Sequence, residues 1–150
     1  MLYQNKLLQI IDANLNRTRE GLRVCEDIVR FEICDKQLTE SLKKIRHTAT
    51  SLIINSDKVS LKKLLLNRNT ESDKTKFLDF KTKPSIDISD VFMSNIERVK
   101  ESLRVLEECF KIIDEKVSRG YRNLRFSAYD VEKRIVKKTR LISCNRQRRA

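Results

Sequence analysis

The chain has 150 residues, the length of one ordinary domain, and contains only 2 Gly and 1 Pro. This composition offers little material for glycine-rich phosphate loops or a many-stranded sheet, and no run of about 18 apolar residues exists that could span a membrane. The net charge is +12, but residues 137–150 hold six Lys or Arg and no acid, so half of the excess lies near the C-terminal end.

Apolar residues recur every three or four positions along most of the chain, a spacing that predicts helices. The long helices are expected, in chain order, at residues 4–32, 36–55, 86–114 and 117–140. The connection 56–85 is expected to hold a short helix at 60–66, and Asp87, Ser89 or Asp90 to cap the third long helix. The N-terminal sequence has no signal-peptide pattern, so we expect a cytoplasmic protein.

Two segments 81 positions apart share residues and spacing. They are DANLNRTREGLRVCEDIVRF at 12–31 and MSNIERVKESLRVLEECFKI at 93–112, and LKKIRHTA at 42–49 matches YRNLRFSA at an offset of 79. Each half of the chain, about 4–55 and 86–140, is therefore expected to be a helix pair. The sequence predicts an all-α fold, a helical bundle of two repeated helix pairs with pseudo-two-fold symmetry. We expect one domain over 1–140, followed by a basic tail at 141–150.

Polar residues recur on the expected apolar faces of these helices. At about 100° per residue, Asn14 and Arg17 fall within the apolar stripe of the first helix, whereas Glu26 and Asn16 point away from it. By the same reasoning, the residues expected to face the bundle interior in the other three long helices are Asn95, Arg98, Arg46 and Arg125.

Four inward arginines exceed the nearest acids at helical spacing, Glu20 and Glu101. Burying an unpaired guanidinium costs several kcal/mol, so we expect an anionic ligand to supply the missing charge. Arginine suits phosphate because two parallel N–H donors match two phosphate oxygens. The alternative is a symmetric buried network that fixes the register of the helices, formed by Arg17, Glu20, Arg98, Glu101 and the two asparagines.

The connection contains a second cluster of polar side chains, at Arg68, Asn69, Thr70, Glu71 and Asp73. Such a loop could hold a phosphate and its Mg²⁺, because this ion takes one or two carboxylates together with phosphate oxygens. On composition alone, a solvated linker is the favoured interpretation of this loop.

These motifs resemble one helical family. The matching runs are DANLNRTREGLRVCED at 12–27, LKKIRH at 42–47 and RNTESD at 68–73, and the likeness covers about residues 7–135. The family comprises hydroxymethylpyrimidine phosphate kinases found alone or fused ahead of thiamine-phosphate synthase in some bacteria. This sequence departs from its pattern at Asn69, where the family has Asp, and at Lys74-Thr75, where it has an apolar residue and glycine. The first change removes one potential carboxylate ligand.

The resemblance implies transfer of the γ-phosphoryl group of ATP, with Mg²⁺, to 4-amino-5-hydroxymethyl-2-methylpyrimidine phosphate. No GxxxxGKS segment is present, so side chains rather than a glycine-rich backbone would hold the phosphates. The residues expected to neutralise phosphate charge in catalysis are Arg17, Arg46, Arg98 and Arg125. The residues expected to bind substrate are Asn14, Asn95, Glu20, Glu101, Arg68 and Thr70. The residues expected to hold Mg²⁺ are Asp73 and Glu71.

Two other functions are weighed against the kinase. One is a non-catalytic module that binds the phosphorylated pyrimidine and partners thiamine-phosphate synthase. The other is a nucleic-acid-binding bundle, which we do not expect because the chain has 3 Tyr, 6 Phe and no Trp for base stacking. The sequence leaves open which half binds nucleotide and whether the bundle forms a homodimer.

Overall fold

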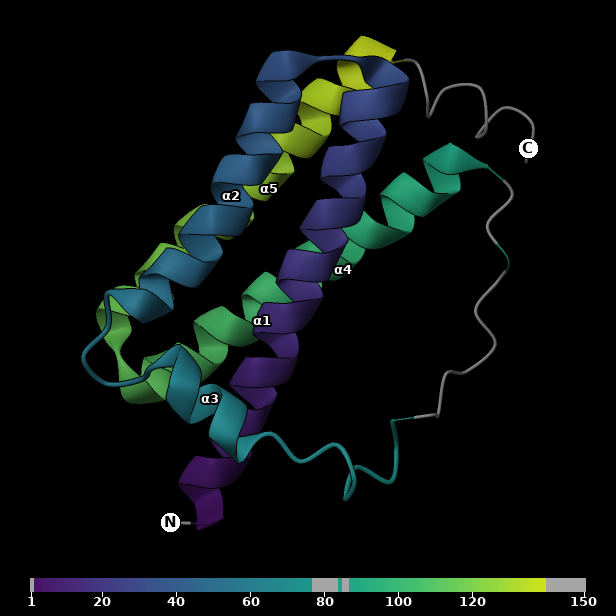
Figure 1. Cartoon of the computed structure of the whole chain (residues 1–150). Helices are drawn as coiled ribbons and strands as arrows, with labels where there is room; N and C mark the ends of the chain where they lie inside the picture. Colours follow the sequence, from purple (N-terminus) through teal and green to yellow (C-terminus); the bar gives the residue numbers. More distant parts are fainter. Residues whose placement is uncertain (1, 77–83, 85–86, 140–150) are drawn as a thin grey trace.

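The computed structural model describes residues 2–76, 84 and 87–139, and within these ranges every regular element is a helix (Figure 1). The helices, in chain order, are α1 (Leu2–Ile28), α2 (Lys36–Ile54), α3 (Leu61–Asn67), α4 (Ile88–Ile113) and α5 (Glu115–Thr139). The predicted boundaries are therefore close, and the predicted tail at 141–150 lies outside the described residues. A π-helical turn, Val29–Ile33, extends α1 and ends at Cys34 in the left-handed conformation, with φ 57°.

Side-chain caps define where three of the helices begin. The carboxylate of Asp35 accepts a hydrogen bond from the backbone N–H of Leu38 at the start of α2, at 2.9 Å. Ser60 caps α3 in the same way. Asp87, one of the three predicted candidates, caps α4 by accepting from the N–H of Asp90. Each cap satisfies one of the N–H groups that a helix leaves unpaired at its first turn.

The four long helices form a bundle of two consecutive pairs (Figure 1). The first pair is α1 with α2, and the second is α4 with α5. The pairs meet where α1 crosses α4 and where α2 runs alongside α5, and α3 packs on α1. The prediction of an all-α bundle is confirmed, and its pseudo-two-fold symmetry stays a prediction.

The crossing of α1 and α4 is close because it is built from small residues. A Cβ atom at Gly21 would lie 2.8 Å from Cγ2 of Val99, so the helices approach within a distance that only glycine permits here. Beside it, the buried hydroxyls of Thr18 and Ser102 share a hydrogen bond of 2.7 Å. The first glycine of the chain is therefore used for helix packing.

The predicted apolar stripes form the core, with one exception. Leu22, Leu103 and Ala128 are fully buried, and Tyr121 is also buried and donates from its hydroxyl to the backbone carbonyl of Ala49 at 2.7 Å. Ile10, at a position where the apolar spacing of α1 would place a core residue, is 46% exposed. Its neighbour in sequence, Ile11, takes the core position instead.

Candidate functional site

A cleft of about 560 Å³ lies between α1 and the loop that follows α3. We call it the α1–loop cleft. On the helix side it is lined by Lys6, Gln9, Asp12, Ala13, Asn16 and Glu20, and on the loop side by Arg68, Asn69, Thr70, Ser72, Asp73 and Lys74. The fold thus brings the first resembling run and the polar loop together, although they are more than 40 residues apart in the chain.

An ion pair ties the loop to the helix. Nε and Nη2 of Arg68 donate to the two carboxylate oxygens of Asp12 at 2.7 and 2.9 Å. Asp12 is buried, and these hydrogen bonds raise the pKa of the Arg68 guanidinium. A second tie runs from the amide of Gln9 to the backbone carbonyl of Asn67 at 3.0 Å. The bidentate geometry fixes Arg68 at the edge of the cleft.

Asn16, which was expected to point away from the apolar stripe, lines this cleft. It is half-buried, and its amide donates to the backbone carbonyl of Asp12 at 3.0 Å. The sequence carried a signal for this arrangement, because Asp12, Asn16 and Glu20 follow one another at intervals of four residues and so share one helix face.

The loop is shaped by its own side chains. Oδ1 of Asn69 accepts from the N–H of Ser72 at 3.1 Å, so the residue that replaces the family's Asp makes a local turn. Oδ1 of Asp73 accepts from the N–H and hydroxyl of Thr75 at 3.0 and 2.9 Å. These bonds, led by the one from the backbone, lower the pKa of Asp73, so this carboxylate stays ionised near neutral pH.

The cleft collects four of the predicted site residues, Glu20, Arg68, Thr70 and Asp73. Glu71 lies in the same loop and is exposed, but it does not line the cleft. Sequence reasoning missed Lys6, Gln9 and Asp12 as site residues. Only the last of these stood within a resembling run.

The cleft contains carboxylates that are candidate ligands for the expected Mg²⁺. Within the described ranges, no three Asp, Glu, His or Cys side chains are grouped closely enough to form a metal site by themselves. Three carboxylates line the cleft, and that of Asp12 is already bound by Arg68. Glu20 and Asp73 remain, which fits an ion that takes one or two carboxylates and completes its shell with phosphate and water.

The prediction that four arginines face the interior in excess of nearby acids is wrong. Arg17 and Arg98 are exposed, because a long side chain at the edge of an apolar stripe can extend into solvent. Arg46 and Arg125 are largely buried, but each is paired with a buried glutamate. These glutamates are Glu26 and Glu107, which spacing from a single apolar stripe did not identify.

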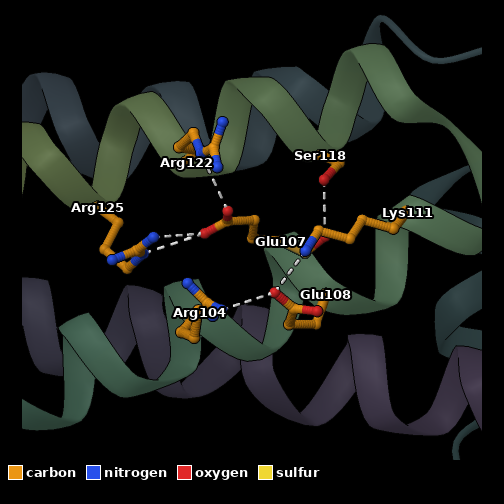
Figure 2. Close-up of polar contacts among 7 residues, drawn as sticks. All are labelled: Arg104, Glu107, Glu108, Lys111, Ser118, Arg122 and Arg125. Atoms are coloured by element: carbon orange, nitrogen blue, oxygen red, sulfur yellow. Dashed lines mark hydrogen bonds and ion pairs between the residues drawn. The ribbon is translucent and has the colours of Figure 1, made fainter.

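The same ion pair forms in each half of the chain. Nε of Arg46, on α2, lies 2.9 Å from Oε2 of Glu26, on α1. Nε and Nη2 of Arg125, on α5, donate to Oε2 of Glu107, on α4, at 3.0 and 2.8 Å (Figure 2). The internal repeat had already aligned these residues, so it contained a signal for the pairs. The alternative of a buried network of Arg17, Glu20, Arg98 and Glu101 with the two asparagines is also wrong, because these four charged residues are exposed.

The two asparagines at the crossing are bound to their own helices. The amide of Asn14 donates to the carbonyl of Ile10 at 2.9 Å, and that of Asn95 donates to the carbonyl of Val91 at 2.8 Å. Asn14 is 5% exposed, and its amide oxygen accepts from Arg17 at 3.4 Å. Neither asparagine lines the α1–loop cleft.

A second cleft, of about 460 Å³, contains two more predicted residues, Glu101 and Arg125. It lies between α4 and α5 and is also lined by Glu97, Lys100, Arg104 and Tyr129. Lys100 is held between Glu97 and Glu132, at 2.8 Å from the latter, and its ammonium lies 5.3 Å from the centre of the Tyr129 ring. The predicted site residues therefore do not converge on one place.

Comparisons with known proteins find matches over most of the chain. The ThiD2 family model matches residues 9–134. The chain is 34% identical over 128 residues to a thiamine-phosphate synthase of Prochlorococcus marinus (strain AS9601), a match that covers 85% of this chain and 34% of that protein. It is 31% identical over 134 residues to the thiamine-phosphate synthase of Nostoc punctiforme, covering 89% of this chain and 36% of that protein. It is 33% identical over 124 residues to the thiamine-phosphate synthase of Rhodopirellula baltica, covering 82% of this chain and 32% of that protein.

The chain thus spans about a third of the length of these relatives. No solved structure matches it. In the described part of the chain, no helix is both long and apolar enough to cross a membrane.

Proposed function

Because this chain belongs to the ThiD2 family, we propose that it acts in thiamine biosynthesis as a phosphotransferase. The reaction is the transfer of the γ-phosphoryl group of ATP to the phosphate of 4-amino-5-hydroxymethyl-2-methylpyrimidine phosphate. The products are ADP and the pyrimidine diphosphate. Relatives named thiamine-phosphate synthase support the same pathway.

The observation that carries the proposal is the α1–loop cleft. It combines three cations, Lys6, Arg68 and Lys74, with the hydroxyls of Thr70 and Ser72. Its volume of about 560 Å³ falls in the usual range of small-molecule sites, roughly 300–1,000 Å³. Cations and hydroxyl donors are the groups that phosphoryl transfer needs, because its catalysis rests on positioning and on neutralising charge.

The absence of a glycine-rich phosphate loop is consistent with this assignment. Both glycines of the chain lie inside helices, Gly21 against Val99 and Gly120 against Leu52. Side chains must therefore bind the phosphates. Arg68 is oriented for this by Asp12, while Lys6 and Lys74 can follow a phosphate group as point charges.

The chemistry needs no general base from the protein. An oxygen of the acceptor phosphate attacks the γ-phosphorus of ATP, the bond from that phosphorus to the β–γ bridging oxygen breaks, and ADP leaves with the electron pair. The acceptor oxygen is already anionic, so no proton has to be removed. Glu20 and Asp73 would hold Mg²⁺, which supplies positive charge to the phosphate oxygens when bound.

The test is turnover by the purified chain. We expect ADP and pyrimidine diphosphate to form in equal amounts from ATP, Mg²⁺ and the pyrimidine phosphate, measured by anion-exchange chromatography. Lys74→Met should reduce kcat/KM by about ten- to a hundredfold, because it removes one positive charge that would stabilise the transferred phosphoryl group. Lys62→Met, an exposed lysine of α3 outside the cleft, is the matched control. No turnover by folded protein, or equal losses in both variants, would refute the proposal.

A second candidate function is a binding module that works beside the synthase without chemistry. It is favoured by the finding that the chain matches only about a third of proteins named thiamine-phosphate synthase. Isothermal titration separates the two functions. A module binds the pyrimidine phosphate equally well with and without ATP and Mg²⁺ and forms no ADP, whereas the kinase forms ADP only when all three are present.

A further inference from the structure

A pocket of about 330 Å³ lies where α4 ends and α5 begins, away from the α1–loop cleft. It is lined by Glu107, Lys111, Glu115, Ser118, Arg119 and Arg122, and we call it the α5 pocket. We propose that the α5 pocket binds a phosphate group, either as inorganic phosphate or as a phosphate ester. The proposal is independent of the phosphotransferase function.

The buried acid of this pocket, Glu107, is already neutralised by Arg125, which lies outside the pocket lining. Glu107 is 2% exposed, and Arg125 donates two hydrogen bonds to Oε2 of this residue (Figure 2). Nε of Arg122 lies 3.3 Å from the other oxygen, Oε1. One carboxylate thus faces two guanidinium groups, and Arg122 is the surplus cation.

The pocket lining also offers guanidinium N–H donors that have no hydrogen-bond acceptor within the described ranges. Arg122 is oriented by Glu107 but makes no hydrogen bond with any residue in the described ranges, and 59% of its side chain is exposed. Arg119 is exposed and forms neither an ion pair nor a hydrogen bond within those ranges. Two guanidinium groups with free N–H donors on one pocket wall suit the several oxygens of a phosphate.

Cations outnumber carboxylates around the pocket. The carboxylate of Glu108 contacts Lys111 at 2.8 Å and Arg104 at 3.0 Å (Figure 2). With these partners included, five cations stand against three carboxylates. The cations are Arg104, Lys111, Arg119, Arg122 and Arg125, and the carboxylates are Glu107, Glu108 and Glu115. A ligand of charge near −2 would balance this surplus.

The first half of the chain contains a counterpart whose lining residues have equal numbers of cations and acids. A pocket of about 410 Å³ lies at the start of α2. Each α5-pocket residue has an equivalent there at an offset of 81 or 79, namely Glu26, Arg30, Lys36, Thr39, Glu40 and Lys43. Glu40 stands where the α5 pocket has Arg119, and Asp35 adds a further acid, so three cations meet three acids. Counted in the same way, by lining residues alone, the α5 pocket has three cations, Lys111, Arg119 and Arg122, against the two carboxylates of Glu107 and Glu115. The lining is therefore balanced at the start of α2 and has one surplus cation at the start of α5.

The experiment is an NMR titration of the whole chain with inorganic phosphate. Sodium chloride is reduced as phosphate is added, so that the ionic strength stays constant. We expect saturable amide shifts in the last turns of α4 and the first turns of α5, and none at the start of α2. Repeating it with glycerol 3-phosphate assigns the pocket to whichever form binds more tightly. Absence of saturation, or shifts confined to residues after 137, would overturn the proposal.

Variants distinguish the pocket from general attraction to a basic protein. Arg119→Glu should weaken binding at least tenfold, whereas Arg19→Glu, the same change at an exposed position of α1, should alter Kd less than twofold. Equal weakening by both substitutions would contradict binding in the α5 pocket. Glu40→Arg should add a second set of shifts around α2. If charge reversal prevents folding, Arg119→Gln provides the same test and should weaken binding about threefold.

Discussion

Removal of the Glu107 carboxylate should cost a large share of the free energy of unfolding. Arg125 is only 11% exposed, and Glu107→Ala would leave its guanidinium buried without its acceptor. Losing one partner of a buried ion pair costs about 3–5 kcal/mol, against a total of about 5–15 kcal/mol for an ordinary domain. With a urea m-value of about 2 kcal/mol/M, the unfolding midpoint should fall by about 1.5–2.5 M.

Urea unfolding followed by circular dichroism at the helix band measures this change. The adjacent Glu108 provides the control, because its side chain is 45% exposed and it pairs only with exposed cations. Glu108→Ala should cost less than about 1 kcal/mol. The double replacement Glu107→Leu with Arg125→Met should recover most of the loss, since neither charge then remains buried. The reasoning fails if Glu107→Ala and Glu108→Ala are equally mild, or if the double variant is no better than the single one.

Three further outcomes follow from local geometry. Gly21→Ala should lower the free energy of unfolding by about 1–3 kcal/mol, because its Cβ would lie 2.8 Å from Val99; an unchanged thermal melt would contradict the close crossing. A thiol reagent at pH 8 should modify exposed Cys34 in the native protein but reach Cys25 only after unfolding, because burial raises the pKa of Cys25 to about 12, and peptide mass mapping reads both sites. Asp73 should titrate below the ordinary 3.8 in carboxyl NMR, so any stability it lends is present above that pH and lost as the pH falls through its lowered pKa; titration at or above 3.8 would contradict its bonds to the loop backbone.

The helices were predictable because their signals are local. Apolar spacing located the long helices, and Asp87 was among the expected caps because its chemistry acts within one turn. The error at Glu26 came from assigning α1 a single buried stripe. This helix packs on both α2 and α4, so its buried arc is wider than one stripe and includes a residue placed on the outer face.

The candidate site was only partly predictable because its contacts are distant in sequence. The motif at Asp12 and the loop at Arg68 were each recognised, but no spacing rule joins residues 56 positions apart. Arg17 shows the opposite failure, since a charged residue at the edge of an apolar face was expected inside although its side chain can reach water.

The two Glu–Arg pairs have a consequence for the order of folding events. Each links helices that follow one another in the chain, with separations of 20 and 18 residues. Contacts between residues close in sequence form early because little loop entropy must be lost. Each helix pair, α1 with α2 and α4 with α5, should therefore assemble before the two pairs dock. The docking of α1 on α4 through Gly21 then belongs to the late step. Substitutions at this crossing should accelerate unfolding while leaving the refolding rate nearly unchanged, in contrast to those at Glu26 or Glu107.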